Sequence, residues 1–89
     1  MTAFRGKVLR DGAAILDPAA GEYENRGIPG GTPDWGGYFV APAEVFIEVG
    51  ETLGLVLDDG RSAEILVSSV DAGSHQDTVV QFDVNGKFS

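Results

Sequence analysis

Three dipeptides divide the chain into segments that can pair as hairpins, namely Asp11-Gly12, Asp59-Gly60 and Asn85-Gly86. Aspartate or asparagine followed by glycine favours a two-residue hairpin turn, because both turn positions need a positive φ. Apolar residues alternate with other residues along 53–57, before the second dipeptide, and again along 61–70 after it. A period of two is typical of half-buried strands. The sequence therefore predicts an antiparallel hairpin around Asp59-Gly60.

Further strand patterns are shorter and cover residues 4–10, 13–16, 38–40 and 78–84. Residues 43–49 are ambiguous, because their apolar residues alternate while Pro42 suits the first turn of a short helix. We favour a brief turn followed by extended chain there, and the tail 87–89 either pairs back or frays. Five to six short strands with at most one short helix predict an all-β fold, either a small antiparallel barrel or a strongly bent sheet.

Residues 18–37 differ from the rest of the chain, since they hold six of the 13 glycines and three of the four prolines. Proline removes strand hydrogen-bond donors and glycine weakens strands, so we expect a long loop here, with a short edge strand around 22–26 as an alternative. The remaining composition, 43% apolar and 22% charged, is that of a packed domain. Eighty-nine residues are enough for one domain only.

The chain carries six basic and fourteen acidic residues, a net charge of -8. This balance argues against binding to nucleic acid or to anionic membranes, which depends on clustered positive charge. The sequence contains no cysteine and no apolar run long enough to span a bilayer. Its first residues also lack the apolar segment of a signal peptide. We therefore expect a cytoplasmic protein. The acidic surface serves solubility or, alternatively, docking on a basic partner.

Several strands carry apolar residues on both faces, as where Leu66 and Val70 stand beside Ile65 and Val67. One face packs the core, and the other must be covered by the long loop or by another subunit. The pattern predicts a homodimer that forms through a sheet face or edge.

No residue pattern predicts catalysis, a metal or a cofactor. The single histidine, His75, stands in a polar loop, and the nearby Ser68, Ser69 and Ser74 lie outside any nucleophile elbow. Asp58 and Asp59 offer oxygen ligands, but calcium loops space their ligands at alternate positions. The glycines between 27 and 37 match neither a phosphate-binding loop nor a dinucleotide fingerprint. We predict no catalytic residue, no metal site and no cofactor.

The strongest candidate site is Asp34-Trp35-Gly36-Gly37-Tyr38-Phe39, which places three aromatic residues within five positions at the end of the long loop. Tryptophan and tyrosine anchor interfaces because they offer a large contact area at modest entropy cost. We predict that Trp35 and Tyr38 contact a ligand or partner, with Arg26 and Asp34 as orienting polar groups. In the alternative, Trp35 plugs one end of the barrel while Gly36 and Gly37 let two backbones approach.

Short sequence elements in the second half of the chain carry a family resemblance. Trp35-Gly36-Gly37, Leu55-x-Leu57-x-Asp59-Gly60-Arg61, Glu64-Ile65-Leu66-Val67 and Val80-x-Phe82 together resemble short uncharacterised bacterial proteins that are thought to form small β-barrels. The resemblance covers residues 35–84. It implies the barrel fold and brings no catalytic residue.

These observations predict a non-catalytic binding or interaction module that uses residues 26–38 as its contact surface. A protein partner or self-association is expected, and a small molecule is an alternative occupant. A second hypothesis is an acidic accessory or inhibitory protein that docks on a basic protein or a small ligand. A third is a small hydrolase-like enzyme that uses His75.

Overall fold

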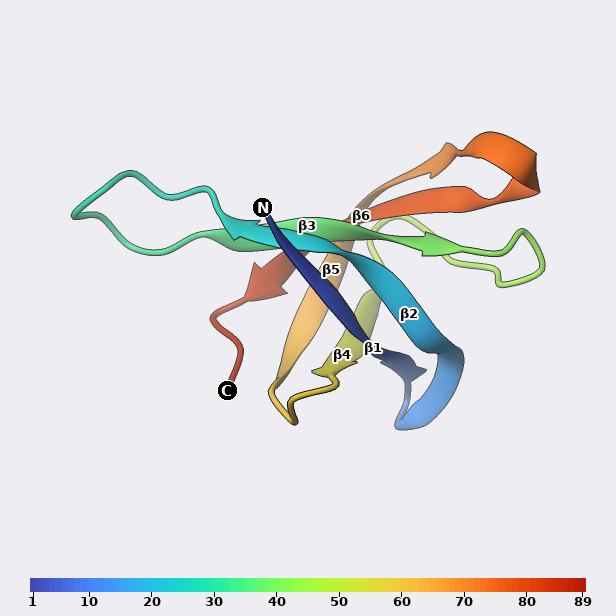
Figure 1. Ribbon diagram of the computed structural model, residues 1–89, viewed down its shortest axis with the longest axis horizontal. Coiled ribbons are helices and arrows are strands. Elements are labelled where there is room, and N and C mark those ends of the chain that lie inside the picture. The colour runs from blue at the N-terminus through green and yellow to red at the C-terminus, as the bar shows by residue number, and fades with distance from the viewer.

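The fold is a closed antiparallel barrel of six strands, as a computed structural model shows (Figure 1). The structure describes residues 1–89 except the side chain of Ser74. The strands are β1 (Thr2–Arg10), β2 (Ala13–Asn25), β3 (Trp35–Ala41), β4 (Thr52–Leu57), β5 (Ser62–Ala72) and β6 (Thr78–Asn85). A short 3-10 segment, η1 (Ser74–Gln76), joins β5 to β6. The all-β prediction is confirmed, and of the two predicted architectures, a barrel or a strongly bent sheet, the chain forms the barrel.

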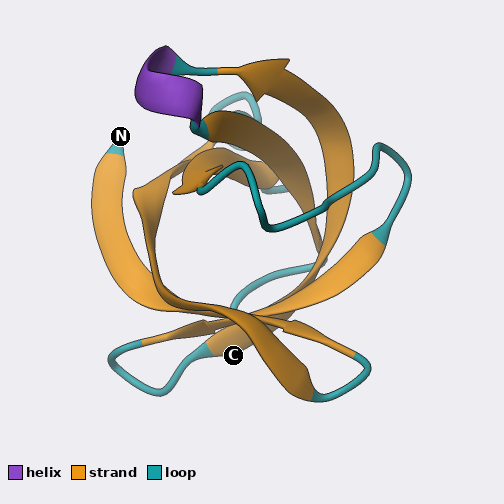
Figure 2. Cartoon of the chain, turned by 90° about the vertical axis from the view of Figure 1, so that its right-hand side faces the viewer, coloured by secondary structure: helices purple, strands orange, loops and turns teal.

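Closure of the barrel depends on two pairs of strands that are distant in sequence. The order around the barrel is β1-β2-β3-β6-β5-β4, so β3 pairs with β6 and β1 pairs with β4. Figure 2, viewed from the side of η1, shows the strands encircling a common centre. Every strand is paired on both sides along its middle, while the ends of β1, β2 and β5 extend beyond the neighbouring strand on one side. Homodimerisation through a sheet face or edge stays a prediction.

The core fills the inside of the barrel with alternate residues from every strand. The largest side chains that are almost fully buried are Val8, Phe39, Leu55, Ile65, Val67, Val80 and Phe82. Phe82 lies between Phe4 and Phe39, with ring centroids 6.3 and 6.0 Å away. Burial of each such side chain contributes about 1.5–3 kcal/mol. The alternating apolar residues predicted over 53–57 and 61–70 supply Leu55, Ile65 and Val67 to this inner face.

The long loop predicted over residues 18–37 is wrong in its bounds, because the loop spans only residues 26–34. Strand β2 continues through Pro18, which falls where β1 and β2 shift register between Gly6 and Val8. Proline is tolerated at such a bulge, since no ladder donor is needed there. A Cβ at Gly37 would lie 2.1 Å from the carbonyl oxygen of Glu22. This glycine belongs to a strand because it lets β2 and β3 approach closely.

A second bulge changes which residues of β5 face outward. The β5–β6 register shifts between Val67 and Ser69, so that Val70 packs against the core while Leu66 stays 46% exposed. The sequence prediction that Leu66 and Val70 share the outer face is wrong, because one extra residue reverses the alternation. The apolar surface that motivated the predicted homodimer is correspondingly smaller.

Residues 42–51 form no strand and close the end of the barrel near η1. Ile47 is buried in the core, and Gly50 donates a backbone hydrogen bond to Val67 at 2.9 Å. The C-terminal tail closes the other side: Ser89 and Ser62 exchange two backbone hydrogen bonds of 2.9 Å. Of the two alternatives left open for the tail, pairing back and fraying, the structure shows pairing back.

Candidate functional site

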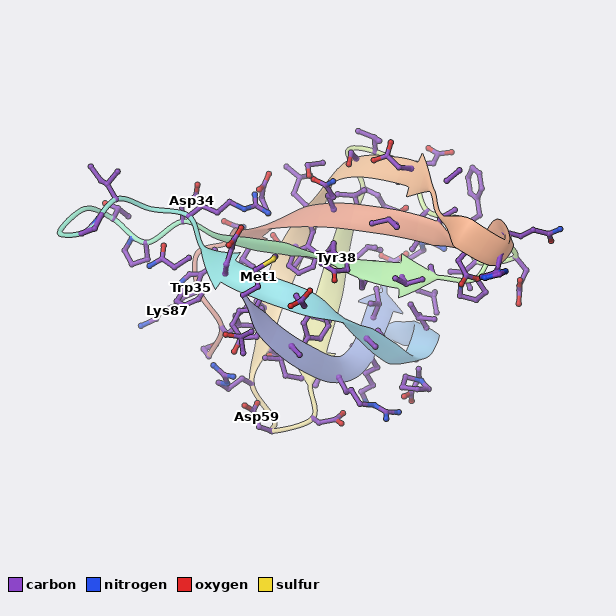
Figure 3. The ribbon with its side chains drawn as sticks, turned by 45° about the horizontal axis from the view of Figure 1, so that its top comes forward. Met1, Asp34, Trp35, Tyr38, Asp59 and Lys87 are labelled. Atoms are coloured by element: carbon purple, nitrogen blue, oxygen red, sulfur yellow. The ribbon has the colours of Figure 1, made fainter. Side chains whose placement is uncertain are left out.

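The four residues that the sequence singled out divide between the two faces of the barrel wall. Along β3 the residues alternate, with Gly37, Phe39 and Ala41 buried inside. Trp35 has the same parity, is half-buried and packs against the core, whereas Tyr38 has the opposite parity. Figure 3 shows Trp35 at one end of the barrel and Tyr38 farther along the sheet. Trp35 and Tyr38 therefore do not form one surface.

Arg26 and Asp34 lie at the base of the 26–34 loop, where they take part in local bonds. The amide of Arg26 donates to the carbonyl oxygen of Asp34 at 2.7 Å, and the amide of Asp34 donates to Oδ1 of Asn25 at 3.0 Å. The Arg26 guanidinium lies over Gly36 and contacts Asp83 at 3.0 Å and Glu24 at 3.8 Å. These groups fix the loop base on the outer wall.

Tyr38 is bonded on the outer wall, across the β2–β3 pair. Its hydroxyl donates to Oε1 of Glu22 at 2.6 Å, and the two residues face each other in the register. This hydrogen bond, with partial burial and the nearby negative charge, raises the pKa of the Tyr38 phenol above its ordinary value. Tyr38 has a local partner and stands apart from Trp35.

Trp35 belongs to an aromatic cluster at the end of the barrel below the 26–34 loop. The ring of Tyr23 lies at its centre, 5.9 Å from Trp35, 5.1 Å from Phe88 and 6.1 Å from Phe4 between ring centroids. Such separations are those of favourable aromatic pairs. The inner side of Trp35 packs against the core at this end of the barrel, as expected if Trp35 plugs that end.

Arg61 adds a positive charge to the aromatic cluster. Its guanidinium carbon lies 6.0 Å from the ring centroids of both Tyr23 and Phe88, a distance at which a cation is attracted to an aromatic face. One Nη donates to the Tyr23 hydroxyl at 3.1 Å, and Nε donates to Asp59 at 2.8 Å. Hydrogen bonds from the amide and side chain of Arg61 lower the pKa of Asp59. The Asp59-Gly60 turn thus orients Arg61 toward the rings.

These side chains line a partly open pocket of about 170 Å³, formed by Tyr23, Trp35, Arg61, Lys87 and Phe88. We call it the aromatic pocket. Figure 3 shows Lys87 beside Trp35 at this end. The pocket joins three aromatic rings with two cationic groups, although the chain has only six basic residues. It can hold a ring-sized apolar group and attract an anion.

Of the residues that line the aromatic pocket, only Trp35 was predicted from the sequence, and the others were not: Tyr23, Arg61, Lys87 and Phe88. These four come from β2, the β4–β5 turn and the C-terminal tail, and they meet only when the barrel closes. The available signals were the alternation of Tyr23 within residues 19–25 and the position of Arg61 directly after a hairpin turn. Neither signal indicates that the residues are neighbours.

The groups considered for catalysis are not assembled in the part of the chain that the structure describes. His75 is exposed in η1 with a positive φ of 56°, and Ser69 donates to Asp71 at 3.3 Å. The side chain of Ser74 lies outside the described residues. Among the described side chains, no group of three His, Asp or Glu residues is arranged to hold a metal ion.

Comparison with protein-family models, with curated proteins and with solved structures found no match. Within the described residues, no helix combines the length and hydropathy that crossing a bilayer requires.

Proposed function

We propose that this protein is a non-catalytic binding module and that its aromatic pocket takes an apolar ring with an attached carboxylate, supplied by a protein partner. The observation that carries the proposal is the composition of the pocket: three of the eight aromatic residues and two of the six basic residues line it. They are brought there by four separate segments of the chain. The proposed contact surface thus differs from residues 26–38, because it keeps Trp35, leaves out Tyr38 and adds residues from three other segments.

The size of the pocket supports a ring as its occupant. An apolar cavity of about 150 Å³ accommodates benzene, and the aromatic pocket measures about 170 Å³. The exposed edge of Trp35 and the ring of Phe88 offer apolar walls that a second ring can contact. Rings at the centre of interfaces contribute strongly to binding because they are fully desolvated there.

Charge supports a carboxylate beside that ring. The chain carries a net charge of -8 and repels anions over most of its surface. Arg61 already forms an ion pair with Asp59, whereas the exposed Lys87 lies at the rim of the same pocket. A C-terminal phenylalanine of a partner combines both features. A small aromatic acid is the alternative occupant with the same chemistry.

Trp35 is the only tryptophan, so its fluorescence reports binding at this pocket. We expect N-acetylphenylalanine, which has a carboxylate, to change the fluorescence saturably and to bind several-fold more tightly than the neutral N-acetylphenylalanine amide. Lys87→Gln should reduce this preference. Lys7→Gln, which removes the same charge from the exposed wall of β1, should preserve it.

Two results would count against the proposal. Absence of a saturable change with either compound would remove the pocket as a ring site. Equal affinity for the acid and the amide would show that the pocket does not recognise the carboxylate, and the pocket would then be a site for neutral rings. Self-association stays a separate prediction, which the mass of the protein in solution tests directly.

A further inference from the structure

Gly54 occupies a position where the fold does not require glycine. It lies inside β4, and its φ is outside the left-handed region. A Cβ built on it would meet only Leu9, at 3.6 Å or more, an ordinary van der Waals contact. Each of the other twelve glycines has either a positive φ or a neighbouring atom closer than 3.2 Å to a built Cβ. Glycine weakens strand interiors and often marks a site where a ligand approaches closely.

A shallow, open groove passes over Gly54 on the outer wall of the barrel. Gly54 is paired with Leu9 of β1 on one side and with Glu64 of β5 on the other. The groove has a volume of about 500 Å³, and Leu9 and Val56 supply its apolar part. Thr52 and Ser62 add hydroxyl groups along it. We call this hollow the Gly54 groove.

The charge of the Gly54 groove is negative. Asp11 and Glu64 line it, and Oε1 of Glu64 accepts a hydrogen bond from Asn85 at 2.9 Å. No lysine or arginine lines the groove itself, and Lys7 of β1 faces Val56 across the β1–β4 pair. Arg10, the next residue before Asp11, is directed to other partners: it forms an ion pair with Glu51 and donates to the carbonyl oxygen of Phe46 at 2.8 Å. The groove therefore combines an apolar floor with carboxylates at its sides.

A second hollow continues the Gly54 groove along the wall. It measures about 300 Å³ and shares Thr52 and Glu64 with the groove, and it adds Leu66, which is 46% exposed. The two hollows together offer space for an extended segment of several residues rather than for one compact ion.

We propose that the Gly54 groove binds a lysine or arginine side chain on an extended segment of a protein partner. The aliphatic part of such a side chain packs on Leu9 and Val56, and its cationic head reaches Glu64. Long basic side chains cover apolar surface in this way while the charged end stays polar. An apolar neighbour on the segment covers Leu66. The proposal does not rest on the aromatic pocket, which lies elsewhere on the barrel.

Nuclear magnetic resonance titration with short peptides tests the proposal. The probes are acetyl-Val-Arg-Val-amide and the matched peptide with citrulline, which has nearly the same shape but no charge. We expect saturable shifts at the amides of Leu9, Gly54 and Glu64 with the arginine peptide, and affinity lower by about fivefold or more with citrulline. Sodium chloride should lower the affinity of the arginine peptide, because salt screens the attraction between exposed charges.

Variants separate the groove from general charge attraction. Gly54→Thr puts a branched side chain on the floor and should abolish the shifts, whereas Gly54→Ala adds one methyl group, should weaken the shifts and should raise the melting temperature. Glu64→Gln should weaken binding by about fivefold, since it removes the charge-assisted bond. Glu44→Gln removes the same charge from the exposed 42–51 segment and should have no effect.

Three outcomes overturn the proposal. Equal weakening by Glu64→Gln and Glu44→Gln would show general attraction to an acidic surface. Absence of saturable shifts at millimolar peptide would show that the groove is not a site. A lower melting temperature in Gly54→Ala would show that the fold itself needs this glycine, and the reason for assigning a ligand to the groove would be lost.

Discussion

The two ends of the barrel use the same kind of residue for different purposes. At the end near η1, Arg10 pairs with Glu51 and bonds to the backbone of Phe46, so that it anchors residues 42–51. At the aromatic end, Arg61 is held by Asp59 and faces the rings of Tyr23 and Phe88. One arginine fixes a segment, and the other lines a pocket.

The apolar residues of the two ends differ in the same way. Near η1, Phe46 and Val49 are 71% and 62% exposed and lie outside the core cluster. At the aromatic end, Tyr23 is 8% exposed and contacts three other rings. The aromatic end is therefore continuous with the core, whereas the exposed side chains of the 42–51 segment are attached to its outside. A binding site continuous with the core is pre-organised, which lowers the entropy cost of binding.

The largest expected difference between the two ends is in stability. Tyr23→Ala should lower the free energy of unfolding by about 3 kcal/mol or more, because it removes a buried ring from the cluster. Phe46→Ala should change it by less than about 0.5 kcal/mol, since that ring is exposed. Urea denaturation measures both. Similar losses for the two variants would contradict the division between the ends.

Much of the barrel was predictable from local patterns, because its hairpins are encoded by neighbours in sequence. Asp11 and Gly12 both adopt positive φ, at 52° and 83°, as the dipeptide requires. The alternation of residues 53–57 and 63–67 matches the buried positions of β4 and β5. The turn follows from the backbone preference of its own two residues, and the alternation follows from the burial of one face of each strand.

The predictions that were wrong concern features that depend on how a strand pairs with its neighbour. Pro18 stays within β2 because it lies in a bulge, where β2 has one residue more than β1, and Val70 turns inward because β5 has one residue more than β6 there. Likewise, the grouping of Trp35 with Tyr38 assumed a loop where the chain forms a strand. Once β3 begins at Trp35, alternation places the two side chains on opposite faces. Lys87 and Phe88 reach the pocket only through the tail's pairing with Ser62.

Acid should act more strongly on the end near η1 than on the aromatic end. The hydrogen bond from Arg10 lowers the pKa of Glu51, and bonds from Arg61 lower that of Asp59. A carboxylate with a lowered pKa in the folded state stabilises the fold above its ordinary pKa, and this contribution is lost as the pH falls through the folded value. Glu51 is the less exposed of the two, 23% against 54%, so solvent screens its pair less.

Melting curves between neutral pH and pH 3 test this order. At neutral pH, Glu51→Gln should lower the melting temperature by roughly 2–4 °C and should flatten its dependence on pH below about 4.5. Asp59→Asn should produce a smaller change. If Asp59→Asn had the larger effect, the Arg61 pair and not the Arg10 pair would be the stronger structural contact, and the contrast between the two arginines would be reversed.

The smallest expected effect concerns the boundary of the aromatic end along β3. The hydrogen bond to Glu22 raises the pKa of Tyr38, so Glu22→Gln should move the ionisation of this phenol to lower pH in an ultraviolet titration. Tyr38→Phe identifies the signal, because only two tyrosines are present. Since Tyr38 lies on the outer wall and Trp35 on the inner side, Tyr38→Phe should leave the response of Trp35 fluorescence to N-acetylphenylalanine unchanged. A weakened response would place Tyr38 back in one surface with Trp35, as the sequence alone had suggested.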